Sequence, residues 1–266
     1  MFELLSEAAE KGAQEIKKLY KKDIEVRAKT SLADVVTEAD ENSQKAIIKH
    51  LLAGMKRKGF NEAEIGFITE EEAGLKPAKH TFIIDPLDGT SGFVFGTDRF
   101  SISIAYMVEG EVKVGFIRHP LKDLIYFAEK GKGVAKIENG QKEILKIKEK
   151  PFRESFVSFN SNSNPQKSIE MFQIAIDLTP HILRIREQGT LILSMAAVAE
   201  NKFQAHIAKG GAIWDVAAAK LVIEEAGGVV LDLGGKELEY ETDNLKKKYP
   251  LICGNQELVK ELLRYL

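Results

Sequence analysis

The sequence predicts a layered α/β protein in which helices enclose two sheets. The first half carries strand-like segments bounded by Gly, Pro and Asn turns, and the second half alternates strand-like with helical segments. No Pro- or Ser-rich linker separates the halves. Because strand runs followed by βα alternation are typical of layered folds, we expect residues 1–266 to form one unit, divisible into halves 1–150 and 151–266.

Two helices are predicted before the strands. Apolar residues recur at helical spacing through residues 1–20, which predicts an amphipathic helix. These positions are Phe2, Leu5, Ala9, Ile16 and Leu19. A second helix is predicted from about residue 37 to residue 55.

An antiparallel meander is predicted next. A short β-branched run ends at Asp85, directly before a Pro/Gly turn. Three segments with alternation or β propensity follow at 100–110, 111–120 and 123–140. Within the last of these, Lys130–Gly133 is interpreted as a hairpin turn and not as a phosphate loop.

The second half predicts alternating strands and helices. A strand, a polar loop and a helix are expected within 151–178, and another strand within 182–190. The remaining segments are a helix at 190–201, a strand at 203–208, a helix at 214–228, a strand at 229–235 and a helix at 256–266.

Composition excludes several functional classes. A net charge of −2 offers no large basic face, so we expect no nucleic-acid polymer as partner. No apolar run approaches the ~18 residues of a membrane span, so no membrane association is expected. Acidic residues interrupt the first apolar stretch, unlike a signal peptide, and a single cysteine fits a reducing compartment. We therefore expect a cytoplasmic protein, with Cys253 a free thiol buried in a strand.

The segment DPLDGT is the most informative stretch of the chain. Asp85 and Asp88 stand three residues apart across a turn, where both carboxylates can face one point. Leu87 lies between them, and its carbonyl oxygen can be exposed in such a turn. These are the oxygen ligands that Mg²⁺ prefers, and a shared aspartate can bridge two ions. The alternative is an Asp/Pro/Gly loop selected for turn geometry alone.

A phosphate cradle is predicted immediately after the second aspartate. Gly89, Thr90 and Ser91 can begin a helix whose free N–H groups receive a phosphate. Gly89 would let the anion approach the backbone closely. Metal and phosphate sites would therefore be adjacent.

Further carboxylates occur in two separate stretches. Glu70, Glu71 and Glu72 follow an apolar, strand-like run, where a solvated acidic loop is the alternative. Asp215 stands at a helix start, where it can simply stabilise the helix dipole. Together they supply the additional carboxylates that a site for two or three Mg²⁺ ions requires.

A water-activating pair is the last element of the predicted site. Thr37 and Asp40 have the spacing of a helix N-terminus, so Thr37 can cap the helix. Asp40 can instead reach the site and pair with the hydroxyl of Thr90. Such a pair would orient and help deprotonate a metal-bound water, the expected nucleophile.

The motifs together resemble the inositol monophosphatase family. KTSLADVVTEAD, GFITEEE, DPLDGTSGF and IWDVAAAKLVIEEAGG occur in the family order between about residues 29 and 230. The resemblance implies an αβαβα five-layer sandwich of the sugar phosphatase type. It also implies a cytoplasmic homodimer with Mg²⁺-dependent, lithium-sensitive phosphomonoesterase activity on a small molecule.

The resemblance assigns the metal ligands. Glu70, Asp85 and the Leu87 carbonyl would hold the first Mg²⁺. Asp85, Asp88 and Asp215 would hold the second, and Glu70 would also position the nucleophilic water.

The resemblance also assigns roles beside the metal ions. Thr90 and Asp40 match the water-activating pair of the family. Backbone groups of Gly89, Thr90 and Ser91 match its phosphate cradle. Lys29 matches a basic residue near the metal site, although a solvated lysine is the alternative.

Three positions are relevant to the substrate when the sequence is compared with the pattern of the inositol monophosphatase family. Inositol monophosphatases usually have Asn at the position of Gly92. A glycine there is more similar to the related 3′(2′),5′-bisphosphate nucleotidases. Ala208 and Lys209 occupy the region of an acidic substrate contact. Gly189 and Thr190 match a substrate-side motif, although a threonine helix cap is the alternative.

Three functional hypotheses follow, in descending order. The first is hydrolysis of a small polyol or sugar phosphate such as myo-inositol 1-phosphate, extending to fructose 1,6-bisphosphate. The second is a nucleotidase acting on adenosine 3′,5′-bisphosphate. The third is a noncatalytic metal-binding regulator, against which the full set of candidate catalytic residues argues. The sequence contains no P-loop, serine-hydrolase elbow or dinucleotide fingerprint.

Overall fold

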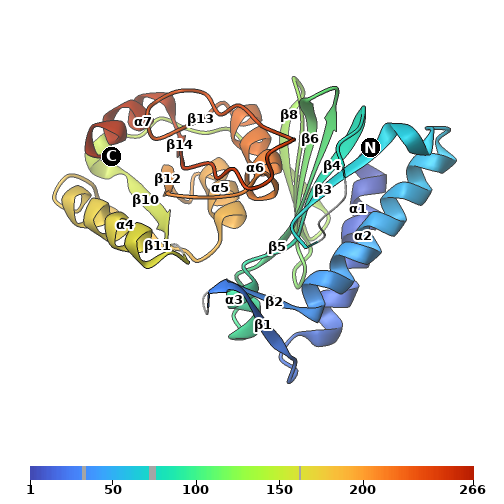
Figure 1. Cartoon of the computed structure of the whole chain (residues 1–266). Helices are drawn as coiled ribbons and strands as arrows, with labels where there is room; N and C mark the ends of the chain where they lie inside the picture. The colour runs from blue at the N-terminus through green and yellow to red at the C-terminus, as the bar shows by residue number, and fades with distance from the viewer. Residues whose placement is uncertain (32–33, 72–75, 162) are drawn as a thin grey trace.

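Helices and sheets alternate in five layers across the molecule (Figure 1). This structure is a computed structural model that describes residues 1–31, 34–71, 76–161 and 163–266. Helices α1 and α2 cover the outer face of a seven-stranded sheet, and α5 and α6 lie between that sheet and a five-stranded one. Helices α4 and α7 cover the far face of the five-stranded sheet. The predicted αβαβα sandwich is confirmed.

The helices form largely where the apolar periodicity predicts them. The short helix α3 begins at Thr90, within the Gly89–Ser91 segment where a helix start was expected. None of the described helices is long and apolar enough to cross a membrane. The helices are α1 Phe2–Leu19, α2 Glu38–Arg57, α3 Thr90–Val94, α4 Pro165–Leu178, α5 Leu191–Ala199, α6 Ile213–Glu225 and α7 Gln256–Leu262.

The seven-stranded sheet contains the predicted meander. Its order is β3-β4-β5-β6-β7-β8-β9, with β3 parallel to β4 and every other pair antiparallel. The exposed edge strand β9 was not predicted, because its QKEI sequence has no apolar alternation. The strands are β3 Ile65–Thr69, β4 His80–Asp88, β5 Ser101–Val108, β6 Glu111–His119, β7 Leu124–Glu129, β8 Gly133–Glu138 and β9 Gln141–Ile144.

The five-stranded sheet has the order β11-β10-β12-β14-β13. Strand β10 is parallel to β11 and β12, whereas β14 is antiparallel to β12 and β13. Cys253 lies fully buried in β14, as predicted, and burial raises the pKa of its thiol to about 12. The strands are β10 Phe156–Asn160, β11 Arg184–Glu187, β12 Ala205–Ala208, β13 Val229–Leu231 and β14 Leu251–Gly254.

A hairpin beside the seven-stranded sheet was not predicted. Strands β1 (Val26–Ser31) and β2 (Asp34–Thr37) pair antiparallel and lead directly into α2. Among the side chains that the structure describes, Val26, Arg27 and Ala28 are exposed and Val35 and Val36 are half-buried. Neither segment alternates apolar with polar residues over its whole length, so the strand signal is weak.

Helix α6 is held against the large sheet by unusually close packing. A Cβ placed on Gly115 of β6 would lie 2.6 Å from the carbonyl oxygen of Ala218, closer than real Cβ atoms approach backbone. The alanines at 217–219 of α6 are all buried. This contact fixes the position of α6 and therefore of Asp215 in its first turn.

Candidate active site

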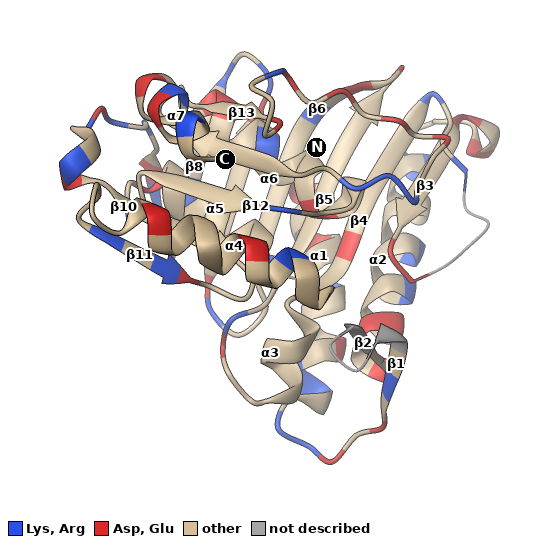
Figure 2. Ribbon diagram, turned by 60° about the vertical axis from the view of Figure 1, so that its left-hand side comes forward, with Lys and Arg blue, Asp and Glu red and all other residues tan. Residues whose placement is uncertain are grey.

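The acidic residues of the first half meet at the ends of two parallel strands. Glu70 follows the end of β3, and Asp85 and Asp88 lie at the end of β4, the strand that pairs with it. Figure 2 shows acidic residues on the ribbon of β4. Because the carboxyl ends of parallel strands lie at one edge of the sheet, these side chains come together despite their separation in sequence.

We expected strand β4 to end at Asp85, but it continues to Asp88. Asp85 pairs with Ser103 and Asp88 with Ser101, so three steps along β4 match two steps along β5. The extra residue is a bulge, which interrupts the alternation of side chains between the two faces. Without it, residues three apart on a strand would point to opposite faces. The bulge therefore allows both aspartates to face the site.

Four carboxylates from three stretches of the chain act on one another. Burial, followed by the negative charges of Glu70, Asp88 and Asp215, raises the pKa of Asp85 well above its usual range. Burial and the charges of Glu70 and Asp88 raise the pKa of Asp215 to about 7. Burial also raises the pKa of Asp88 to about 6, against the lowering effect of hydrogen bonds. The structure thus brings these four residues into one strongly anionic region.

Asp88 is held by the start of α5. Its Oδ2 accepts hydrogen bonds from the Thr190 hydroxyl and, at 3.2 Å, from the N–H of Ile192. Thr190 occupies the N-cap position of α5, but its side chain caps no helix N–H. The threonine-cap alternative is therefore wrong, because the hydroxyl is directed to the aspartate.

Asp85 and Asp215 each bind a nearby backbone group through one oxygen. Oδ1 of Asp85 accepts the N–H of Leu87 at 2.9 Å, and Oδ2 of Asp215 accepts the N–H of Ala212 at 2.5 Å. Asp215 therefore also makes the helix-start contact considered as its alternative role. Within the described residues, no donor reaches the second oxygen of either carboxylate. The same part of the chain contains no group of three or more His, Cys, Asp or Glu side chains that, as placed, could hold a metal ion.

Asp40 both supports the start of α2 and reaches the site. Its Oδ2 accepts the N–H and the hydroxyl of Thr37 at 2.8 Å and 2.7 Å, and Thr37 Oγ1 accepts the N–H of Ala39. The other oxygen, Oδ1, lies 2.9 Å from the Thr90 hydroxyl. The two alternatives considered for this motif are thus compatible. Burial of Asp40, together with the charge of Glu70, raises its pKa to about 6.

Helix α2 supports two other parts of the site, which the sequence did not reveal. The Ser43 hydroxyl donates to the carbonyl of Pro86 at 3.0 Å, and Oε1 of Gln44 accepts the N–H of Glu71 at 3.1 Å. Both side chains are buried. They follow Asp40 by three and four residues, so they share its helix face, and this spacing is the signal that could have identified them.

The helix expected at the predicted phosphate cradle is present as α3, and the cradle itself stays a prediction. Gly89 has φ +88° and precedes α3, and a Cβ there would lie 2.5 Å from the carbonyl oxygen of Arg99. A Cβ on Gly92 would lie 2.8 Å from the same oxygen and 2.9 Å from Oγ1 of Thr97. The close approach of residues 97–99 therefore leaves little room for a side chain at Gly92.

Comparison with known proteins places this architecture in one family. The sequence profile of the inositol monophosphatase family matches residues 1–265. The chain belongs to this family. Its relatives include named phosphatases, and the chain is accordingly an enzyme of the phosphatase class.

Individual relatives match nearly the whole chain. The fructose-1,6-bisphosphatase/inositol-1-monophosphatase of Thermotoga maritima is 32% identical, over 88% of this chain and 85% of its own length. Inositol monophosphatase 1 of Bos taurus is 31% identical, over 85% and 81%. The Nus factor SuhB of Pasteurella multocida is 31% identical, over 99% and 94%.

Solved structures agree on the fold. An inositol monophosphatase from T. maritima superposes with a TM-score of 0.83 at 28% identity, covering 99% of this chain and 94% of its own. The extragenic suppressor protein SuhB from Bartonella henselae gives 0.84 at 26% identity, covering 99% and 97%.

Of the predicted substrate-side residues of this inositol monophosphatase family member, Thr190 contacts a carboxylate, that of Asp88. Gly189 has φ +72°, and a Cβ there would meet nothing within 4 Å. Ala208 is buried at the end of β12. The next residue, Lys209, pairs with Glu170 of α4 at 2.7 Å.

Two predicted residues lie outside what the structure describes. The side chain of Lys29 in β1 and all of Glu72 belong to this group. The Lys130–Gly133 segment is, as predicted, the turn between β7 and β8. There the N–H groups of Gly131 and Gly133 donate to the carboxylate of Glu225 in α6.

Proposed function

We propose that this family member is a Mg²⁺-dependent phosphomonoesterase. Its substrate is a small phosphorylated polyol or sugar such as myo-inositol 1-phosphate, with fructose 1,6-bisphosphate as a further substrate. The observation that carries the proposal is the convergence of Glu70, Asp85, Asp88 and Asp215 beside the glycine-led start of α3. Family membership further supports a lithium-sensitive, cytoplasmic homodimer.

The donor set fits magnesium. Its side-chain ligands are carboxylates, which are hard oxygen donors, and burial together with neighbouring negative charge raises the pKa values of Asp85, Asp88 and Asp215. Glu70, Asp85 and the Leu87 carbonyl would hold one ion, and Asp85, Asp88 and Asp215 a second. Magnesium bound there would acidify water and neutralise phosphoryl oxygens.

The residues of the chain would supply the remaining steps. The Thr90 hydroxyl donates to Asp40, so its lone pairs are available to accept a hydrogen bond from the attacking water. Asp40, with its raised pKa, is suited to take up the proton that this water loses. Glu70 would orient the water. The N–H groups of Gly89, Thr90 and Ser91 would hold the phosphate oxygens.

Magnesium affinity should fall as the pH falls. In the metal-free protein the pKa values of Asp215 and Asp88 are about 7 and about 6, so protons compete for these carboxylates below neutrality. We expect the half-saturating Mg²⁺ concentration to rise about tenfold from pH 7.5 to pH 6. Calorimetric titration of Mg²⁺ at several pH values measures this change, and a constant affinity would contradict the ligand assignment.

The stability of the metal-free protein provides a control, because it should increase over a pH range in which Mg²⁺ affinity decreases. Because these folded pKa values lie above those of unfolded aspartate, the folded state binds more protons, and the free energy of unfolding should rise as the pH falls from 8 to 7. This window avoids buried His206, whose pKa is lowered to about 3 by burial and which therefore destabilises the fold as the pH falls below about 6.5. Saturating Mg²⁺ should abolish the rise.

A substrate panel tests the proposed activity. Phosphate release should require Mg²⁺ and be faster with myo-inositol 1-phosphate or fructose 1,6-bisphosphate than with adenosine 3′,5′-bisphosphate. A preference for the adenosine compound would favour the nucleotidase hypothesis. Absence of turnover with all three compounds would overturn the proposal and favour a noncatalytic metal-binding role.

A further inference from the structure

We propose that Gln44 is a positioning residue for Glu70, and that its side chain strengthens the binding of the Mg²⁺ ion that Glu70 would hold. This inference rests on the proposed function, because it assigns a further residue to the same site. Gln44 lies in the second turn of α2, beyond the motif that ends at Asp40. It hydrogen-bonds the backbone of Glu71, the residue after Glu70.

Gln44 occupies a position where the pattern of α2 favours an apolar side chain. Buried residues recur along this helix at 44, 47, 51 and 55, and the last three are Ile47, Leu51 and Met55. A glutamine buried in such a stripe costs free energy unless its polar groups are hydrogen-bonded. Gln44 is 3% exposed, and its Oε1 accepts the N–H of Glu71 at 3.1 Å. An apolar side chain at this position could not make that contact.

The contact fixes the peptide group that follows Glu70. On the near side of Glu70, β3 pairs with β4 as far as Thr69 and Ile84. On the far side, Gln44 holds the N–H of Glu71. Because the peptide group between residues 70 and 71 is planar, holding this N–H restricts ψ of Glu70. It therefore also restricts the direction in which the Glu70 side chain leaves the backbone.

Three residues on one face of α2 hold three different parts of the site. Asp40 lies 2.9 Å from the Thr90 hydroxyl, and the Ser43 hydroxyl donates to the Pro86 carbonyl at 3.0 Å. Gln44 adds the contact at the end of β3. Helix α2 and strand β3 contribute side chains to one buried core cluster, so the helix is a firm support. Removing the Gln44 contact should therefore affect the ligand from β3 and leave the other two contacts in place.

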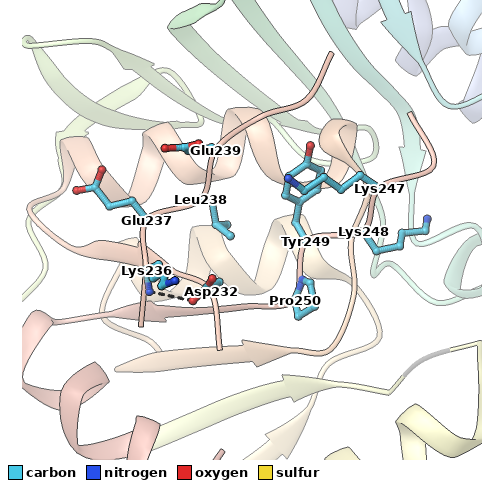
Figure 3. Close-up of a pocket in the computed structure, with 9 residues that line it drawn as sticks. All are labelled: Asp232, Lys236, Glu237, Leu238, Glu239, Lys247, Lys248, Tyr249 and Pro250. Carbon is cyan, nitrogen blue, oxygen red and sulfur yellow. Dashed lines mark hydrogen bonds between the residues drawn. The ribbon is translucent and has the colours of Figure 1, made fainter. Parts of the chain in front are cut away.

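Asp215 is supported through backbone groups instead. The N–H of Tyr249 donates to the carbonyl of Gly211 at 2.8 Å, and the N–H of the next residue, Ala212, donates to Oδ2 of Asp215. Tyr249 also lines an open groove in the segment between β13 and β14 (Figure 3). The nine residues shown around this groove include none of the proposed metal ligands. The side chains of α2 are therefore the better place to test how a ligand is positioned.

Magnesium binding and amide exchange test the assignment. Gln44→Met keeps the length of the side chain but replaces the amide oxygen by a thioether, which accepts hydrogen bonds weakly. Calorimetry should show about tenfold weaker Mg²⁺ binding, as expected when one hydrogen bond no longer holds the ligand in place. Hydrogen exchange of the Glu71 amide should become about tenfold faster. Gln44→Glu retains an acceptor oxygen, so it should restore slow exchange and bring Mg²⁺ affinity to within about threefold of the wild type.

Ile47→Val is the matched control. It removes buried apolar volume at the next position of the same α2 stripe, where the side chain has no polar group to contact the site. This variant should lower the melting temperature but keep Mg²⁺ affinity within about twofold. An equal loss of Mg²⁺ affinity in the control would overturn the inference. Wild-type affinity or wild-type exchange at Glu71 in Gln44→Met would overturn it as well.

Turnover measurements separate this inference from the proposed activity. At saturating Mg²⁺, Gln44→Met should keep KM for myo-inositol 1-phosphate within about twofold, because Gln44 acts on a metal ligand and not on the substrate. If the wild type hydrolyses no phosphomonoester but binds Mg²⁺ about tenfold more tightly than Gln44→Met, the proposed function fails and the Gln44 assignment stands. If the wild type hydrolyses myo-inositol 1-phosphate and Gln44→Met binds Mg²⁺ normally, only the Gln44 assignment fails.

Discussion

Replacing Asp85 by Asn should reduce kcat/KM for myo-inositol 1-phosphate at least about 1000-fold. Asp85 is 1% exposed, and among the four carboxylates it is the one proposed to contact both magnesium ions. Asparagine keeps an oxygen for the N–H of Leu87 but removes the charge. Losing one charge from a ligand shared by both ions would weaken the binding of each ion. Together the ions would supply several kcal/mol of transition-state stabilisation. Phosphate release at saturating Mg²⁺ measures the loss.

The same substitution should have the opposite effect on stability. Burial and neighbouring carboxylates disfavour the charged form of Asp85, so Asn should raise the melting temperature of the metal-free protein at pH 8. Asp123→Asn is the matched control, because Asp123 is exposed in the turn between β6 and β7. Activity of Asp85→Asn equal to that of the control would remove the proposed metal site. A fall in melting temperature in EDTA would instead attribute the lost activity to misfolding.

Local sequence predicted those parts of the site whose neighbours lie close in the chain. The spacing of Thr37 and Asp40 gave the helix cap, and the glycine at 89 gave the turn before α3. The strand-like run before Glu70 correctly placed this residue at a strand end. In each case the signal lies within one short stretch of consecutive residues.

Contacts between segments that are distant in the chain could not be predicted from local sequence. The hydrogen bond from Thr190 to Asp88 joins α5 to β4, and the bulge at Asp85–Asp88 depends on pairing with β5. Ser43 and Gln44 read as ordinary polar helix residues until the fold places Pro86 and Glu71 beside them. The crowding at Gly92 comes from residues 97–99, whose approach the local sequence does not reveal.

Thr90 and Asp40 should act as one catalytic unit. Asp40→Asn and Thr90→Val should each lower kcat about 100- to 1000-fold, since each removes one part of the proposed path that carries the proton from water. The double variant should be little worse than the poorer single variant, because neither group can work without the other. Thr90→Ser should keep most of the activity because it keeps the hydroxyl. Phosphate release from all four variants gives the coupling directly. Multiplicative losses would show that the two side chains act independently despite their 2.9 Å contact, and would overturn the shared proton path.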